Sequence, residues 1–461
     1  MMLAAAVPGA ARGQAREAVC DMPPTPCCVL DAPAAAAAVQ DDTLAIGLQI
    51  WPEHLKDAPQ EQLLALHPTV FRHSAGPGGW KHAEPLPAMA DMAEVRRYVA
   101  RHVAARHEAL ERQAAHLKTL LASTRGKLHL ILWEPPFTDA EQRLRRATDE
   151  GRVMPRSAVP VMAKFYVAVI EALRAYDFPV DAIELANEPN GDWNIRIPPQ
   201  TYVELLQQVR REAALQGLAL PPLAGPGTSS YTALLGYLRD PALGRQLLDA
   251  VDLVSVHAWD DRLDRDIRTV ARETRQRLAA LGYGGHVAVT EFAPTFLDGD
   301  DRSAGRGANK RSALSQSNTD RYAAEVLRTK AALLSLGMSP VIFWEYRDVG
   351  WGKASYGLID LAGRERPTYG AFAQLAGMMG DTKPVAAVAG EDDRTFVFFG
   401  KDDARFILLV NPSAEPARFS FSEGVLRLFG DARLREPSPC GVGAELLLRP
   451  YEFRLLKSTA S

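Results

Sequence analysis

From Asp41 onward, the chain alternates short apolar segments with longer amphipathic segments of helical periodicity. Most of the apolar segments are continuous runs of β-branched and aliphatic residues, which is typical of strands buried on both faces of a parallel sheet. The strand candidates are Thr43–Trp51, Thr69–Ser74, Leu128–Pro135, Ala182–Pro189, Pro221–Pro226, Val251–Trp259, His286–Pro294 and Ser339–Tyr346. The helix candidates are Met92–Ser123, Pro160–Tyr176, Pro199–Gln216, Asp264–Leu281 and Thr319–Leu336.

Eight strand–helix units within residues 41–380 predict a (β/α)₈ TIM barrel, an α/β fold whose usual length runs from ~200 to over 400 residues. A doubly wound open sheet is the main competitor, and it should carry a Gly-rich phosphate turn after an early strand. The nearest candidate, "SAGPGGW" at Ser74–Trp80, does not match GxGxxG and is expected to be a plain loop.

The pattern changes over residues 384–460, where short strand-like segments follow one another with turn residues and no helical stretches between them. This predicts a small antiparallel β-sandwich. We expect it to cover apolar barrel surface, and a carbohydrate-binding role is the alternative.

Residues 1–40 form an alanine-rich leader, either the remnant of a signal peptide or a disordered segment. It lacks a basic first part and a full apolar stretch, and we favour export to the periplasm or the exterior. Three of the four cysteines, Cys20, Cys27 and Cys28, lie in it, and Cys440 is the fourth. Free or incidentally paired thiols are expected, because adjacent cysteines cannot form a CxxC metal clamp.

The overall composition is that of a globular protein, with 47% hydrophobic residues, 24% charged residues and a formal net charge of −3. No basic run or arginine–aromatic stripe indicates a nucleic-acid partner. No apolar run reaches the ~18 residues of a membrane span. We expect a monomer.

Polar and aromatic side chains gather at the carboxyl ends of the predicted strands, which is where the active site of a barrel forms. Each of these residues alone is more often structural than functional, but their convergence on one rim predicts a site. They are Trp51, Arg72, His73, Trp133, Glu134, Asn187, Glu188, His257, Trp259, Glu291, Trp344 and Glu345.

Glu188 and Glu291 end the fourth and seventh strands, and two carboxyls facing one cleft suit glycosidic-bond cleavage. Arg72 is expected to keep Glu291 ionised, and Asn187 to bond a sugar hydroxyl. Rim tryptophans, Trp133 among them, offer flat faces for a sugar ring. Metal catalysis is the chief rival, but the histidines are scattered and no HxH follows the first strand, so no metal and no cofactor is expected. No GxSxG elbow is present.

"NEPN" after the fourth strand, "TEF" at the seventh and "FW" at the eighth together resemble glycoside hydrolase clan A. These are retaining (β/α)₈ glycosidases with the acid/base on strand four and the nucleophile on strand seven. The look is closest to family thirty-nine and to family-five-like bacterial exopolysaccharide glycosidases, which pair a barrel with a small β-sandwich. The resemblance covers about residues 41–460.

The resemblance implies that Glu188 is the acid/base, Glu291 the nucleophile and Asn187 the contact to the sugar 2-hydroxyl. It makes Arg72 the strand-two arginine and Trp344 the platform under the ring being cleaved.

His257 resembles the strand-six histidine, but several positions depart from the pattern. Many members place Tyr two residues after that histidine, where this chain has Trp259. Ala186 replaces an aromatic residue before the Asn, and Glu134 adds an acid where a His or an amide is common. These departures are expected to change the chemistry of the sugar-binding subsites, and they leave the pair Glu188 and Glu291 in place.

The leading hypothesis is therefore an endo-acting retaining β-glycosidase of a bacterial exopolysaccharide or a related β-linked glycan. The second hypothesis is a catalytically weak carbohydrate-binding protein built on the same barrel. Intact Glu188 and Glu291 favour the enzyme, because a pure binder would tolerate their loss.

Overall fold

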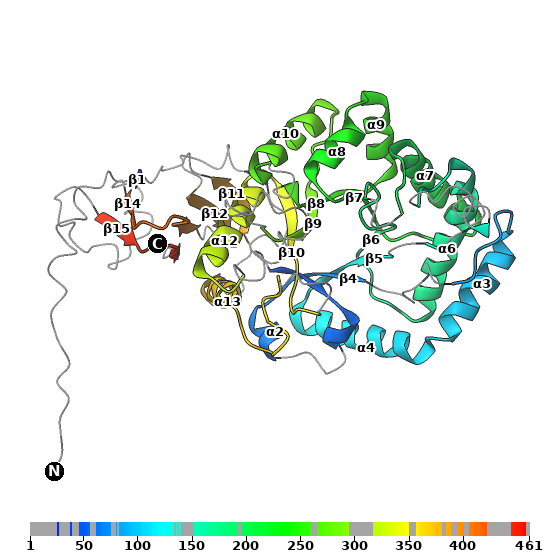
Figure 1. The fold of residues 1–461 in the computed structure, drawn as a ribbon, viewed down its shortest axis with the longest axis horizontal. Coiled ribbons are helices and arrows are strands. Elements are labelled where there is room, and N and C mark those ends of the chain that lie inside the picture. The colour runs from blue at the N-terminus through cyan, green and yellow to red at the C-terminus, as the bar shows by residue number, and fades with distance from the viewer. Residues whose placement is uncertain are drawn as a thin grey trace, which may run out of the picture.

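Eight parallel strands close into a barrel in the computed structural model, in the order β10-β3-β4-β5-β6-β7-β8-β9 (Figure 1). The TIM barrel expected from the sequence is confirmed, with each strand falling within or beside a predicted apolar run. The strands are β3 (Gly47–Ile50), β4 (Val70–Ser74), β5 (Lys127–Ile131), β6 (Ala182–Glu184), β7 (Leu223–Thr228), β8 (Leu253–Ala258), β9 (Val287–Phe292) and β10 (Met338–Phe343).

The structure describes most of the barrel and parts of the flanking segments. The described residues are 25–26, 37–38, 46–55, 61–74, 80, 83–132, 135–136, 138–139, 152–191, 195–260, 265–294, 317–349, 356–379, 384–389, 394–400, 405–421 and 444–457. Within this part of the chain, no helix is both long enough and apolar enough to cross a membrane.

Amphipathic helices cover the outside of the barrel, each with an apolar stripe turned toward the strands. Thr319 caps the amino end of the helix that follows the seventh strand, through a bond from the Tyr322 amide to its hydroxyl. The helices are α2 (Glu61–Ala65), α3 (Met92–Ala104), α4 (His107–Thr124), α6 (Val159–Ala175), α7 (Pro199–Leu215), α8 (Tyr231–Leu238), α9 (Pro241–Ala250), α10 (Ile267–Ala280), α12 (Asp320–Ser335) and α13 (Pro367–Met379).

One helix prediction was wrong: the segment expected as a single helix over Met92–Ser123 is broken between α3 and α4. The break lies at Arg106, which leaves helical geometry with φ −129° and ψ 15°. A straight helix of that length would extend ~48 Å. The break lets the two halves follow the curve of the barrel, as Figure 1 shows. The buried stripe stays in phase across it, from Val103 to Leu110, so hydrophobic periodicity could not reveal it.

The small second domain consists of two sheets, as the sequence predicted. The larger has the strand order β16-β13-β12-β11-β2 and the smaller β1-β14-β15. The strands that follow the barrel pair antiparallel with one another, and β14 also pairs in parallel with β1. They are β11 (Pro384–Ala389), β12 (Thr395–Gly400), β13 (Arg405–Val410), β14 (Ala417–Phe421), β15 (Ala444–Leu448) and β16 (Phe453–Lys457).

Two short segments from before the barrel join these sheets. β1 (Thr25–Pro26) pairs with β14, and β2 (Ala37–Ala38) pairs antiparallel with β11. These four residues of the predicted leader are therefore part of the small domain. The rest of residues 1–40, and all four cysteines, lie outside the described residues.

Alternate side chains of β13 serve two different cores, because successive residues of a strand point to opposite faces. Phe406 and Leu408 belong to the same buried cluster as the barrel core, and the sheet lies against α12 and α13 (Figure 1). Ile407 and Leu409 pack instead with Phe419 of the second sheet. One face of the larger sheet thus covers the barrel, while the other closes the sandwich.

This division predicts different effects for two neighbouring truncations. Leu408→Ala should destabilise the barrel, at a cost of about 2–5 kcal/mol for a buried leucine. Leu409→Ala should weaken mainly the sandwich. All seven tryptophans lie between residues 51 and 351, so tryptophan fluorescence during urea unfolding reports on the barrel. Equal shifts of that fluorescence midpoint in both variants would contradict the division.

Candidate active site

A fully buried arginine, Arg72 of β4, organises the carboxyl end of the barrel. Its Nη1 donates to Oε1 of Glu291 at 2.6 Å and to Oε1 of Gln49 at 3.0 Å. Its Nη2 donates to Oδ1 of Asn187 at 2.9 Å, and its Nε to Oε2 of Glu184 at 3.2 Å. Burial alone would lower the pKa of Arg72, but the two carboxylates raise it above its usual value, so the guanidinium stays charged.

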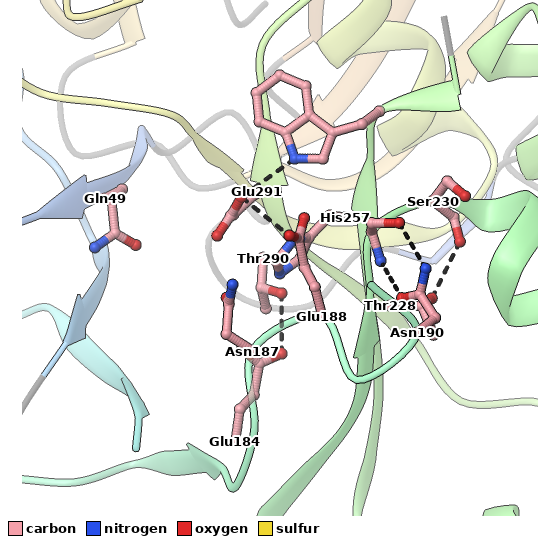
Figure 2. Close-up of polar contacts among 12 residues, drawn as sticks. Gln49, Glu184, Asn187, Glu188, Asn190, Thr228, Ser230, His257, Thr290 and Glu291 are labelled. Atoms are coloured by element: carbon pink, nitrogen blue, oxygen red, sulfur yellow. Dashed lines mark hydrogen bonds and ion pairs between the residues drawn. The ribbon is translucent and has the colours of Figure 1, made fainter. Parts of the chain in front are cut away.

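Glu184 lies in the middle of this network, although the sequence analysis did not select it. It is the last residue of β6 and is almost fully buried. Burial would raise the pKa of Glu184, but the charge of Arg72 holds it below its ordinary value. Oε1 of Glu184 accepts a bond from the Thr290 hydroxyl at 2.9 Å (Figure 2). The available signal was a charged residue inside an apolar run, four positions before Glu188.

A glycine makes room for this carboxylate. Gly227 of β7 has a φ of +58°, and a Cβ there would lie 3.1 Å from Oε1 of Glu184. Any other residue would therefore meet both a strained backbone and a crowded carboxylate.

The pair Asn187-Glu188 follows β6 in a bent segment, where the sequence analysis expected the strand itself to continue to Glu188. The amide of Glu188 donates to the Gly227 carbonyl at 3.1 Å, and the Glu188 carbonyl accepts from the Gly191 amide at 2.9 Å. Glu188 has a φ of +45°, which is unusual for a residue with a side chain. The bend turns Glu188 toward the seventh strand and away from the Glu184 side of the network (Figure 2).

His257 of β8 joins the two glutamates of the predicted pair. Its Nδ1 lies 2.9 Å from Oε1 of Glu188 and 3.3 Å from Oε2 of Glu291 (Figure 2). Its Nε2 faces Nη2 of Arg72 at 3.4 Å. A guanidinium can only donate, so this arrangement assigns the imidazole proton to Nδ1, where it points at the carboxyl groups of Glu188 and Glu291.

Trp259 contacts the second oxygen of Glu291. Its indole N–H donates to Oε2 of Glu291 at 3.2 Å. The glycosidases that the sequence resembles commonly have a tyrosine at this position, which bonds their nucleophile. The indole of Trp259 supplies a single donor to the same carboxylate, so this departure from the pattern keeps the hydrogen bond and changes only the donor.

Glu188, His257 and Glu291 are also the group that could hold a metal ion among the residues that the structure describes. Their ligand atoms all lie within 4.8 Å of one another. Glutamate and histidine are ordinary ligands of divalent zinc. The same three groups therefore suit either acid–base chemistry or a cation, and an experiment must separate the two.

Two tryptophans and a fourth acid, Glu345, lie where the first and last strands of the barrel meet. Trp51 follows β3 and Trp344 follows β10, and their rings meet edge to face with centroids 5.2 Å apart. The indole N–H of Trp51 donates to Oε2 of Glu345. Burial raises the pKa of Glu345 to about 8, and the Trp51 bond only partly opposes this. Glu345 is therefore largely a neutral acid at pH 7.

The structure brings six of the predicted site residues into one network: Arg72, Asn187, Glu188, His257, Trp259 and Glu291. Trp344 lies half-buried at the same end of the barrel, beside Trp51. Trp133 and Glu134 lie outside the described residues. The network also contains Gln49, Glu184 and Thr290, which were not predicted. Gln49 and Thr290 lie inside strands, and Glu184 ends β6 four residues before the expected strand end at Glu188.

Solved structures share this fold, although no protein-family model and no curated protein matches the chain. SrfJ from Salmonella typhimurium matches with a TM-score of 0.60 at 12% identity, over 94% of each chain. A GH39 β-xylosidase from Caulobacter crescentus matches with a TM-score of 0.56 at 16% identity, over 92% of this chain and 98% of that one.

A glycoside hydrolase family 30 subfamily 8 xylanase from Clostridium acetobutylicum matches with a TM-score of 0.55 at 14% identity, covering 93% of this chain and 98% of its own. At these identities the likeness establishes the architecture: a barrel with a small β domain, over nearly the whole of both chains. This agrees with the fold that the clan A resemblance implied.

Because Glu188 has a positive φ, we expect glycine to be tolerated better than alanine at this position, the reverse of the usual order. Glu188→Ala keeps a side chain at positive φ, whereas Glu188→Gly relieves it, although glycine is normally the more destabilising choice. We expect Glu188→Gly to be more stable than Glu188→Ala by about 1 kcal/mol, the cost of a left-handed residue. Urea unfolding of both variants measures this, and a less stable glycine variant would contradict the strain.

Because Glu345 is largely neutral, replacing it with glutamine should stabilise the protein by an amount that depends on pH. Between the unfolded pKa of about 4.5 and the folded value of about 8, the unfolded chain has lost the proton that the folded protein keeps. Stability therefore falls as pH rises through this window, by up to ~1.4 kcal/mol per pH unit. Glu345→Gln cannot titrate and can still accept the Trp51 bond. Its stability relative to wild type should be higher at pH 8 than at pH 5, and a constant difference in urea unfolding would count against the assignment.

Proposed function

We propose that the protein is a retaining β-glycosidase with Glu188 as the acid/base and Glu291 as the nucleophile. The observation that carries this proposal is the approach of two buried carboxyls on either side of His257 Nδ1, with ligand atoms within 4.8 Å. Retaining enzymes hold their carboxyls ~5–5.5 Å apart and inverting enzymes ~6.5–9.5 Å, since inversion needs room for a water molecule. One oxygen of Glu188 and one of Glu291 therefore approach more closely than the inverting range, which favours double displacement.

The surroundings of the two acids support different roles. Glu291 accepts from Arg72 at 2.6 Å and from the indole of Trp259, which suits a carboxylate that attacks as an anion. Glu188 contacts the imidazole of His257 and sits on a separate segment after β6. It is placed to give a proton to a leaving group and to take one back.

In the first step, an oxygen of Glu291 forms a bond to the anomeric carbon while the bond to the leaving oxygen breaks. Glu188 gives its proton to that oxygen. In the second step, Glu188 takes a proton from water, the water oxygen bonds to the anomeric carbon, and Glu291 leaves as a carboxylate. Asn187, held by Arg72, is placed for the sugar 2-hydroxyl, and Trp344 provides the face under the ring.

The substrate we propose is an oligo- or polysaccharide with β-linkages, cleaved within the chain, such as a bacterial exopolysaccharide. Two of the fold neighbours are a xylanase and a β-xylosidase, which fits a β-linked substrate. We further propose a monomer that is periplasmic or secreted and has no nucleic-acid partner. A panel of β-glucans, xylans and bacterial exopolysaccharides, with sizing of the products, tests the substrate class and the endo action.

Mechanism-based labelling tests the chemistry directly. Incubation with 2,4-dinitrophenyl 2-deoxy-2-fluoro-β-xyloside or the matching β-glucoside should add one sugar, and peptide mapping should place it on Glu291. Glu291→Ala should show no adduct. If no sugar of the panel forms an adduct while calorimetry shows binding, the protein is a carbohydrate binder and the enzymatic proposal is wrong.

The acid/base role has its own test. Glu188→Ala should still form the glycosyl-enzyme from a dinitrophenyl glycoside and then stall, because deglycosylation has lost its general base. Azide needs no base and should restore turnover, giving the β-glycosyl azide. An α-azide from this variant would mean that the two roles are reversed.

The same label distinguishes acid–base chemistry from a metal site. Dialysis of the wild-type protein against EDTA should leave labelling and turnover unchanged, because the proposal assigns Glu188, His257 and Glu291 to proton transfer and nucleophilic attack. Loss of activity with EDTA, restored by zinc, would favour the metal.

A further inference from the structure

Arg72 contacts two carboxylates, and the reaction proposed above uses only one of them. Nη1 bonds Glu291 at 2.6 Å at the rim, while Nε bonds Glu184 at 3.2 Å deeper in the barrel. Arg72 is fully buried and Glu184 is exposed to only 2%. A charge in such a place must be paired, because removing its partner leaves an uncompensated buried ion.

Glycosylation removes one of these partners. When Glu291 forms an ester with the anomeric carbon, its carboxylate charge disappears, while the guanidinium of Arg72 keeps its own. Glu188 gains a negative charge in the same step, and its carboxylate oxygen bonds His257. The Nε–Glu184 ion pair is untouched by the chemistry.

We propose that Glu184 is a positioning residue that acts as the permanent counter-ion of Arg72, so that the charge of Glu291 can be consumed in the covalent intermediate. This inference rests on the proposed glycosidase function. Glu184 does not touch the reacting atoms; it acts through Arg72, which holds both Glu291 and Asn187.

Contacts from several strands keep Glu184 in this role. Thr290, the residue before Glu291 in the sequence, donates to Oε1 of Glu184 at 2.9 Å. Glu184 thus contacts Thr290 as well as Arg72, the cation that bonds Glu291. The absent side chain of Gly227 leaves space for that oxygen.

The charged and titratable groups facing these two acids come from every side of the barrel. Glu184 faces Arg72 of β4, His129 of β5, Tyr202 of α7 and His257 of β8. Glu291 is faced by Arg72, His257, Glu188 and Glu345. Arg72 is the cation that contacts both acids.

The informative substitution is Glu184→Gln, which removes the charge and keeps the shape. The amide oxygen can still accept from Arg72, and the amide nitrogen can donate to Thr290. In this variant the ester form of Glu291 leaves Arg72 without a counter-ion at its contacts, whereas release of the sugar restores one. Formation of the intermediate should therefore suffer, and its breakdown should not.

The kinetic test separates these two steps with the 2-fluoro glycoside that labels the wild-type protein. We expect the second-order rate of inactivation of Glu184→Gln to fall by on the order of tenfold to a hundredfold. This is less than the roughly 10²–10³-fold loss on removing a donor that contacts the developing charge directly, because Glu184 acts through Arg72. Reactivation of the isolated adduct should be unchanged or faster.

Two control variants sharpen the outcome. Thr290→Val keeps the Glu184 charge and removes its hydrogen bond, so it should retain the wild-type ratio of inactivation to reactivation rates. Glu212→Gln removes a buried carboxyl on α7, outside the network, and should change neither rate. A Glu184→Gln variant slowed equally in both steps, or matched by Thr290→Val, would show a merely structural role and overturn the proposal.

A second test needs no substrate. Glu291→Gln imitates the uncharged ester, so thermal unfolding of Glu184→Gln, Glu291→Gln and the double variant forms a cycle. The double variant should lose more in Tm than the two single losses together, and additional Arg72→Met should recover part of that loss. Additive shifts would overturn the counter-ion role.

These tests still decide about Glu184 if the protein is not a glycosidase or if Glu184→Gln does not fold. No labelling of the wild-type protein by any sugar refutes the glycosidase, while the Tm cycle still tests the counter-ion. If Glu184→Gln does not fold, Arg72→Met/Glu184→Gln decides: a folded double variant shows that unpaired Arg72 was the fault, and an unfolded one contradicts the proposal.

Discussion

The burial of one guanidinium is the constraint on which the site depends. A charge removed from water must find partners of matching geometry, and Arg72 finds them on four other parts of the barrel. Gln49 comes from β3, Glu184 and Asn187 from β6 and the bend after it, His257 from β8 and Glu291 from β9. Each partner is fixed by the fork of the guanidinium, so the barrel must close in this register for the arginine to be satisfied.

The acids at this end of the barrel have different surroundings. Glu184 is deep in the barrel and ion-paired, and Glu291 is ion-paired at the rim. Glu345 is buried beside the indole of Trp51, and the pKa of Glu345 is raised to about 8. Glu184, whose pKa is held down by Arg72, and Glu345, whose pKa is raised by burial, therefore differ in charge at the same end of the barrel. That difference comes from placement alone, and it is the general means by which a protein runs acid and base chemistry at one pH.

The sequence was sufficient to predict the barrel because the same pattern, an apolar run followed by a helical segment, is repeated eight times. Each buried strand is a continuous apolar run, and the polar residue that ends it, such as Glu291, must lie at the common rim. The function of Glu184 could not be predicted in this way, since an acid within a strand is informative only when its partner is known. The helix break at Arg106 was hidden by a buried stripe that stays in phase. The positive φ of Glu188 has no signature in a residue type that favours other conformations.

The pairing of β2 with β11 sets an order on the assembly of the molecule during synthesis. Ala38 lies opposite Ala386, so β2 leaves the ribosome about 350 residues before its neighbour exists. The barrel closes when β10 pairs with β3, and all of its strands are made before β11. The large domain can therefore form first, while the preceding segment waits for a sheet to join. The small domain is the last part to be completed, and its arrival covers α12 and α13.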